Sequence, residues 1–342
     1  IIVLRGSHSM TVDLENPEWF LYGLDSGSRQ LQFARTSEQI IRSVSFLDGR
    51  EVISTKREFH EVPLRDALDQ PVAEPDVPDR FLLHTAFCGS TFLARLLDVP
   101  GKSLCYREPQ VLVDLARMKV DKHPVVDDER LWDGLLRFCL GQLRKHWGDH
   151  QTLVKPSNWA NIILPDLSRV STDLRVATVT SSPEDCLVAH LRGGQDRIKY
   201  SLNLLNALIS SGYVDEDDVQ SAQAAVPSGL EQVLRLLLVL HKAQLSLLTT
   251  TMDASEPVFR CEYRELQQEA VALANTCSQH LGLALARSDI ESAYAREGAV
   301  HAKGGQETYD AAREYSQSQD LLNQFGNEIN GALDWSAVPQ ST

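Results

Sequence analysis

Paired cysteines are missing from this chain of 342 residues, whose six cysteines are scattered with no CxxC spacing. No histidine stands near them at a spacing suited to zinc, which excludes the zinc-finger and zinc-ribbon classes. Most of these cysteines lie in apolar runs, where a reduced, buried thiol is the ordinary state. We therefore expect a cytoplasmic protein with free thiols and no bound metal.

Positive charge is also in short supply. The chain has 33 Lys and Arg against 47 Asp and Glu, which gives a formal charge of −14. Such a surface repels phosphate backbones, so we expect no nucleic-acid partner. A local basic site can still hold a small anion within this field.

The chain lacks an apolar run that is free of charge over the length of a bilayer. The longest run, residues 230–248, carries Glu231, Arg235, His241 and Lys242. A span of ~20 residues tolerates such groups poorly, so we expect a buried helix and no membrane partner. Residues 1–10 contain Gly-Ser-His-Ser-Met and read as a cloning tag remnant, so we expect the natural chain to start at Met10 without a signal peptide.

The remaining sequence divides near residue 79. Residues 11–79 alternate short apolar runs with turn residues, which predicts a small β-rich N-terminal piece, and prolines 71, 75 and 78 predict a stiff linker at its end. Strand signals then alternate with helical stretches over 80–342. The predicted strands are 80–85, 151–154, 174–180 and 258–261, and the predicted helices include 91–98, 128–147, 183–192, 196–211 and 228–250. This alternation predicts an α/β fold, a three-layer sandwich whose mainly parallel sheet is flanked by helices.

The segment 81–95 is the most informative one. An apolar strand leads through small residues directly into a helix whose first turn offers Gly89, Ser90 and Thr91. Amide groups at a helix start, with hydroxyls beside them, suit an anion. A Walker A loop is excluded because His84 stands at its first glycine and Ser90 at its lysine. Tight strand–turn–helix connections also occur for structural reasons, so the segment alone leaves anion binding open.

The same segment resembles the 5′-phosphosulfate loop of the sulfotransferase superfamily through Cys88-Gly89-Ser90-Thr91 and the following Phe92-Leu93. Further segments recur in that family's order: Tyr106-Arg107-Glu108-Pro109, Val154-Lys155-Pro156-Ser157-Asn158, Pro183 with Asp185, 258–266 and 280–283. The chain thus looks like a divergent, bacterial-type member over about residues 80–285. The resemblance implies a P-loop type of nucleotide-binding fold and a 3′-phosphoadenosine 5′-phosphosulfate donor. It also implies sulfuryl transfer to a hydroxyl or amine of a small-molecule or peptide acceptor, without a metal.

The resemblance assigns the cofactor to Cys88, Gly89, Ser90, Thr91, Phe92 and the position of Ser181, and it fails at three points. The family's basic loop residue falls at Phe87, its 3′-phosphate arginine at Ser181, and a neighbouring serine at Ala189. A charge-assisted contact contributes about 1.5–3 kcal/mol, so the loss of two weakens phosphate binding by orders of magnitude. Either other cations meet the phosphates or the cofactor is a different one.

Replacement cations are available in the sequence. Lys155 ends a predicted strand at the sheet edge where open α/β folds place ligands, although a solvated surface lysine is the alternative. Lys303 lies in the Gly-rich segment 297–305, which resembles the family's cap over the nucleotide but is also typical of an ordinary surface loop. Arg107 and Arg192 are further candidates.

The candidate catalytic residues are Glu108, Lys155 and His84, with Lys155 as the cation that steadies the sulfate oxygens. Glu108 is placed to act as the general base, unless it merely pairs with Arg107 at the surface. His84 is a second candidate base, although a histidine in an apolar run is more often a hydrogen-bonded core residue. Cys88 at a helix start has the position of a nucleophile, but no His-Asn or His-Asp spacing supports one, so we interpret it as lining the loop.

Two alternatives to the transferase remain open. A phosphoryl-transfer enzyme using ATP and Mg²⁺ is disfavoured by the missing Walker lysine and by the lack of a clear Walker B aspartate. A non-catalytic relative that binds an anion or a protein partner is favoured by the residues at 87 and 181. The sequence shows neither the acceptor nor the oligomeric state.

Overall fold

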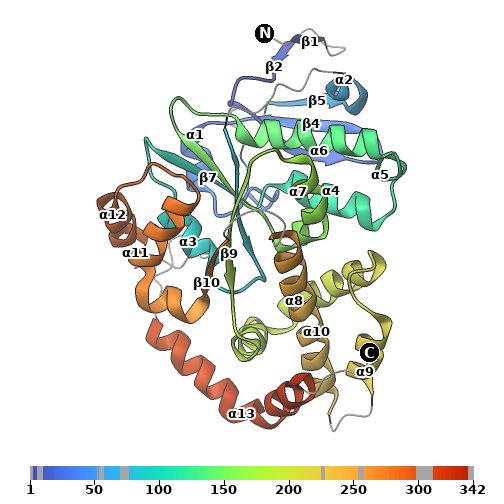
Figure 1. The fold of residues 1–342 in the computed structure, drawn as a ribbon, viewed down its shortest axis with the longest axis vertical. Helices are drawn as coiled ribbons and strands as arrows, with labels where there is room; N and C mark the ends of the chain where they lie inside the picture. The colour runs from blue at the N-terminus through green and yellow to red at the C-terminus, as the bar shows by residue number, and fades with distance from the viewer. Residues whose placement is uncertain are drawn as a thin grey trace.

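A five-stranded parallel sheet forms the centre of the molecule, in the order β10-β9-β6-β8-β7 (Figure 1). The computed structural model describes residues 3–5, 11–51, 53, 58–69, 77–224, 228–252, 258–297 and 311–337. The strands are β6 (Asp79–His84), β7 (Ser103–Arg107), β8 (Gln151–Lys155), β9 (Leu174–Thr180) and β10 (Phe259–Glu262). The predicted α/β class is therefore confirmed, and the four strands predicted from apolar runs agree with the observed ones to within one residue at each end.

The sheet is buried on both faces. All six residues of β6 are buried, and successive side chains enter different apolar cores. Phe81 and Leu83 belong to the first core, and Leu82 belongs to the second. The first core is built with α4 (Gln110–Val120), α6 (Glu129–Arg144) and α7 (Leu164–Val170), the second with α3 (Ser90–Leu96), α11 (Tyr263–His280) and α12 (Arg287–Glu297). A parallel sheet needs this cover because its strands are apolar on both sides.

The N-terminal piece contains a three-stranded antiparallel sheet, β3 (Trp19–Asp25), β4 (Gln30–Arg35) and β5 (Phe59–Pro63). Its buried Leu21 and Phe33 belong to the same apolar core as Phe81, so this sheet packs onto the central fold (Figure 1). The chain before it forms the two-stranded pair β1 (Val3–Arg5) and β2 (Thr11–Asp13). The predicted proline-rich linker falls largely on residues 70–76, which lie outside the described residues.

After α1 (Glu38–Ser43) the chain returns to the central sheet. The amide of Leu47 donates to the carbonyl of Arg107 at 2.7 Å, and the amide of Gln110 donates to the carbonyl of Leu47 at 3.0 Å. These bonds fix residues 44–51 at the carboxyl end of β7. The short helices α2 (Leu64–Leu68), α5 (Pro124–Asp127) and η1 (Asn158–Ile163) complete this half of the molecule.

The other half contains the long helices α8 (Pro183–Ser210), α10 (Gly229–Met252) and α13 (Ala311–Ala337), with the short α9 (Glu216–Gln223) between the first two. Leu187, Leu237 and Ile329 join α8, α10 and α13 in a third apolar cluster. The two helices predicted at 183–192 and 196–211 are one helix, α8, which is kinked at Gly194 (φ 70°, ψ −165°). In the described part of the chain, α10 alone is long and apolar enough for a bilayer, and more than half of its most apolar stretch is buried in the fold.

The strand order shows where the connections between the strands diverge. β7 and β8 lie on one side of β6, and β9 and β10 lie on the other. In open parallel sheets, the connections that diverge at such a strand leave a crevice at its carboxyl end. The segment after His84 is therefore placed where a ligand is expected.

Candidate functional site

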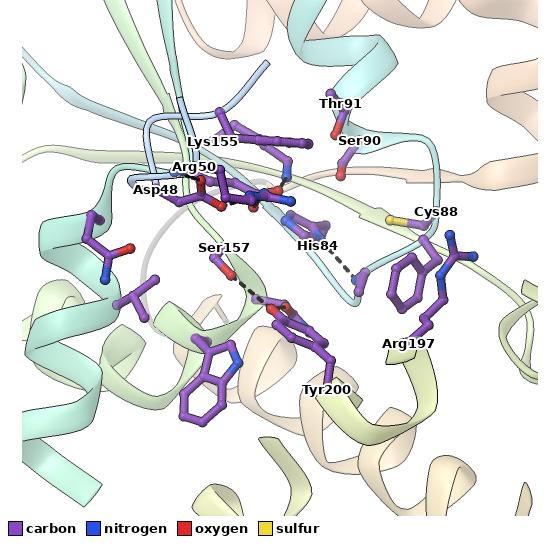
Figure 2. A pocket seen from close by; sticks show the side chains of 18 of the residues that line it. Asp48, Arg50, His84, Cys88, Ser90, Thr91, Lys155, Ser157, Arg197 and Tyr200 are labelled. Carbon is purple, nitrogen blue, oxygen red and sulfur yellow. Dashed lines mark hydrogen bonds and ion pairs between the residues drawn. The ribbon is translucent and has the colours of Figure 1, made fainter. Parts of the chain in front are cut away.

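A cavity of about 550 Å³ opens at this carboxyl end, between the loop after β6, the ends of β7 and β8, residues 46–50, α4 and α8 (Figure 2). Gly89 to Phe92 and Lys155 line it together, as expected if the loop and the lysine serve one site. The other lining residues are Phe46, Asp48, Arg50, His84, Ala86, Phe87, Cys88, Glu108, Gln110, Val113, Arg117, Ser157, Asn158, Trp159, Arg197 and Tyr200.

The loop between β6 and α3 has an unusual backbone. Ala86 (φ 76°), Phe87 (φ 52°) and Gly89 (φ 79°) all adopt left-handed conformations, which are costly for the two residues that carry a Cβ. At Gly89 a Cβ would lie 3.1 Å from Leu266 and 3.2 Å from Tyr263, so close packing against α11 also favours glycine there.

This conformation leaves polar groups available inside the cavity. Within the described part of the chain, the amides of Gly89, Ser90 and Thr91 donate to no protein acceptor, and the hydroxyls of Ser90 and Thr91 have no hydrogen-bond partner. Both side chains are nevertheless buried. Buried polar groups are ordinarily paired, so this set suits an external anion.

Lys155 and Glu108 form a close ion pair beside the loop. The Lys155 side chain is 1% exposed, and its Nζ lies 2.6 Å from Glu108 Oε1. The backbone amide of Glu108 also donates to the carbonyl of Lys155 at 2.6 Å, and Glu108 itself has a left-handed φ of 55°. The surface alternatives for both residues are therefore wrong: Lys155 is buried, and Glu108 pairs with it and not with Arg107.

A second charged pair comes from the N-terminal piece. Arg50 forms an ion pair with Asp48, and its guanidinium also lies 3.6 Å from Glu108 Oε2. Phe46 packs beneath these charges, 4.4 Å from the Arg50 guanidinium and 5.8 Å from Lys155 Nζ. Sequence reasoning missed all three residues because segment 44–51 carries no recognisable motif and is brought here by its backbone bonds to β7 and α4.

A hydrogen-bonded chain of polar side chains supports the opposite wall. Tyr200 Oη donates to Asn158 Oδ1 at 2.8 Å and lies 3.2 Å from Ser157 Oγ. Asn158 in turn donates to Gln244, which also accepts from Asn161. Burial, followed by the nearby Glu108 and Asp48 carboxylates, raises the pKa of Tyr200 to about 12, so the phenol stays protonated at neutral pH.

Arg197 is a further cation that the sequence did not reveal. Its guanidinium lies 4.2 Å from the centre of the Phe87 ring and donates to the carbonyl of Ala189 at 2.6 Å. In Figure 2 it lies near Cys88 at one end of the cavity, away from Asp48, Arg50 and Lys155. The pair Gly193-Gly194 was the available sequence signal, because two glycines inside a helical stretch indicate a break.

His84 is held on both sides. Its Nδ1 accepts from the amide of Ala86 at 2.9 Å, so its Nε2 carries the proton and donates to the carbonyl of Pro156 at 2.9 Å. The ring lines the cavity but is 4% exposed. This arrangement fits a histidine that shapes the loop and does not support the candidate role as a base.

Cys88 and Phe92 serve the packing of the loop. The Cys88 thiol is fully buried and donates to the carbonyl of Val179 at 3.1 Å, which fits a lining residue and not a nucleophile. Phe92 reaches the cavity from α3 and packs edge-on against Tyr294 of α12.

The remaining candidates lie elsewhere. Ser181 is buried at the end of β9 and does not line the cavity; its hydroxyl has no partner among the described residues. Arg107 pairs with Asp98 at 2.6 Å and donates to the backbone carbonyls of Ile41, Arg42 and Val44, so it is structural. Arg192 pairs with Glu314 of α13 at 2.5 Å. Lys303 lies outside the described residues.

Metal-binding clusters are absent from the described residues, where no group of three or more His, Cys, Asp or Glu side chains converges. The cavity instead combines aromatic walls with cations, hydroxyls and amides. That combination suits an anionic group joined to an organic body.

No protein-family model matches the chain, and no curated protein matches its sequence. Among solved structures, the chain is similar to the sulfotransferase domain from the curacin biosynthetic pathway. The alignment covers 74% of this chain and 99% of that domain, with 12% identity and a TM-score of 0.40. We rest no argument on a likeness of this degree; the layered α/β fold stands on the sheet and helices described above.

Proposed function

We propose that this protein is a transferase that moves a sulfuryl group from a 3′-phosphoadenosine 5′-phosphosulfate-type donor to a hydroxyl or amine of a small-molecule or peptide acceptor. One observation carries the proposal. The unpaired amides and hydroxyls of Gly89, Ser90 and Thr91 face the same cavity as the Lys155–Glu108 pair. An anion site and a candidate base thus lie within one space.

The phosphosulfate end of such a donor fits the residues present. Gly89, Ser90 and Thr91 offer donors with no other partner in the described chain, and Lys155 and Arg197 supply positive charge. The 3′-phosphate end fits less well, because Ser181 is withdrawn from the cavity and Ala189 has no polar side chain. The proposal therefore specifies only the sulfate and the 5′-phosphate of the donor.

Glu108 is the residue that we assign to proton removal. Its carboxylate is oriented by Lys155 and by its own backbone bond, and it faces the space next to the loop. When bound, the donor supplies an electrophilic sulfur whose bond to phosphate oxygen breaks as the acceptor oxygen or nitrogen attacks. The acceptor loses its proton to Glu108, which neutralises the carboxylate, while negative charge builds up on the departing phosphate. The Lys155 ammonium stabilises this negative charge.

We assign the acceptor to the lining residues Phe46, Val113 and Trp159, together with the polar Tyr200 and Arg50. Apolar walls with a few polar groups bind the body of an organic acceptor and exclude water from the reacting centre.

Titration calorimetry with adenosine 3′,5′-bisphosphate and with Mg-ATP tests the proposal. The transferase predicts heat with the bisphosphate and none with Mg-ATP. Binding of Mg-ATP alone would move the protein to phosphoryl transfer. Heat with neither ligand would leave the non-catalytic alternative and end the transferase proposal.

A further inference from the structure

The position of Arg197 depends on a break in its own helix. Gly194 has φ 70° and ψ −165°, a conformation essentially restricted to glycine, and the helix changes direction there. At Gly193 a Cβ would lie 2.0–2.4 Å from the Nε, Cδ and Cζ atoms of Arg197. The two glycines thus let the Arg197 side chain fold back across the helix toward the loop.

Its contacts at the loop are aromatic and backbone groups. The guanidinium lies 4.2 Å from the centre of the Phe87 ring, and one nitrogen donates to the Ala189 carbonyl at 2.6 Å. A guanidinium carries five N–H donors, so most of them are left for another acceptor. The cation–π contact fixes the plane of the group without neutralising its charge.

The other cations of the cavity are paired with carboxylates. Lys155 lies 2.6 Å from Glu108, Arg50 pairs with Asp48, and Arg117 lies 3.8 Å from Asp114. Within the described part of the chain, Arg197 has no carboxylate at ion-pair distance. A half-buried guanidinium without a counter-ion is unfavourable unless an anion joins it.

The surroundings of Arg197 add to this imbalance. Burial, followed by the neighbouring Arg192 cation, lowers the pKa of Arg197, and Glu314 opposes the shift. Glu314 is already engaged by Arg192 at 2.5 Å and by Tyr263 at 3.0 Å. His190, which packs edge-on against Phe87, is neutral near pH 7 because burial lowers its pKa to about 4.

We propose that Arg197, delivered by the Gly193-Gly194 break and held on the Phe87 ring, binds the phosphate or sulfate oxygens of the donor at the loop 86–91. The inference rests on the proposed function and adds the residue that provides the loop with its cation. It also explains how Phe87 stands where the family resemblance places a basic side chain: the ring supports a cation that comes from α8.

The primary experiment compares Arg197→Met with Lys199→Met by calorimetry, using adenosine 3′,5′-bisphosphate and inorganic pyrophosphate. Lys199 is exposed on the same helix and does not line the cavity, so its variant controls for net charge. Loss of a charge-assisted contact predicts at least tenfold weaker binding of both probes by Arg197→Met and less than twofold change for Lys199→Met.

Two further variants separate the charge from the fold. Gly193→Ala retains the arginine but displaces it from the Phe87 ring, and it should weaken both probes while the melting temperature stays within a few degrees. Phe87→Arg in the Arg197→Met background returns a cation to the loop and should restore at least part of the lost affinity.

The outcomes are distinguishable. Equal affinity of the wild type and Arg197→Met for both probes removes Arg197 from the site and leaves the proposed function standing. Pyrophosphate binding that depends on Arg197, without bisphosphate binding, supports the anion site and overturns the nucleotide donor. Failure of the wild type to bind either probe overturns both.

Discussion

Lys155 and Glu108 are joined twice, once by the 2.6 Å contact between their side chains and once by the 2.6 Å bond from the Glu108 amide to the Lys155 carbonyl. The backbone bond continues the pairing of β7 with β8 one residue beyond the last ladder pair, Arg107 with Lys155. The two charges are thereby fixed by the sheet itself at the edge of the cavity.

Removing one member of this pair should cost more than removing both. Lys155→Met leaves the Glu108 carboxylate without its buried partner, and we expect a loss of about 3–5 kcal/mol in the free energy of unfolding. The double variant Lys155→Met/Glu108→Gln should recover at least half of that loss, because no unpaired charge remains. Urea denaturation of the four proteins measures the coupling, and strictly additive losses would mean that the pair contributes nothing as a unit.

Glu108→Gln should separate chemistry from binding. The amide keeps the size of the side chain but accepts no proton, so transfer of radiolabelled sulfate to a panel of phenols, alcohols and amines should fall by about 100-fold or more. The affinity for adenosine 3′,5′-bisphosphate should change less than threefold. A variant with wild-type turnover would remove Glu108 from the reaction.

Gly89 should be more sensitive to substitution than another glycine of the same conformation. Gly89→Ala adds a Cβ at 3.1–3.2 Å from Leu266 and Tyr263, whereas Gly101, with φ 78°, has open space around it. Both substitutions carry the cost of a left-handed alanine, about 1–2 kcal/mol. Thermal or urea unfolding should show the larger loss for Gly89→Ala, and equal losses would show that α11 yields to the added methyl group.

The six thiols should be inert in the folded protein. All six are free and buried, and burial raises the pKa of Cys105, Cys186 and Cys261 to about 12. Since the thiolate is the reactive form, modification by Ellman's reagent should proceed only as fast as the chain unfolds. Reaction of the Cys88 thiol within seconds under native conditions would make it a candidate nucleophile again.

Stability should depend on the neutral state of two buried histidines. Burial lowers the pKa of His190 and of His241 to about 4, against about 6.5 in an unfolded chain. Between these values the unfolded chain binds protons that the folded chain does not, so the free energy of unfolding falls as the pH drops from 6.5 to 4. Each histidine contributes up to about 3 kcal/mol to this loss.

His190→Asn isolates one of these contributions. Its free energy of unfolding should fall less steeply over this window than that of the wild type, by up to about 1.4 kcal/mol per pH unit. The wild type and the variant share the same carboxylates, so the titration of these groups cancels in the comparison. Both proteins also contain Arg197 and His241, whose charges lower the pKa of His190. Parallel curves would show that His190 does not titrate on unfolding.

Much of the fold follows from local patterns. Apolar runs such as 174–180 predict their strands directly, and the turn at Gly89 predicts a loop that enters a helix. The meeting of this loop with Lys155 was also predictable, because the carboxyl ends of parallel strands share one edge of the sheet. Ser181 shows the limit of this reasoning, since it directly follows the neighbouring strand β9 and still does not line the cavity.

The rest of the site depends on long-range contacts that no short window of sequence contains. Arg50 arrives through backbone bonds to residues far along the chain, and Arg197 arrives through a helix kink that a pattern search divides into two helices. His84 and Cys88 have the residue types of catalytic groups, but their atoms are occupied by bonds within the fold. Lys303 stays a prediction.

The anchoring of residues 44–51 on β7 has a consequence for the order in which the protein matures on the ribosome. Val44 is held by Arg107, which is made 63 residues later, so this wall of the cavity stays unfinished until β6 and β7 have emerged. This segment therefore settles only after residues made later have joined it, and slowing synthesis just after it should expose its apolar side to chaperones for longer.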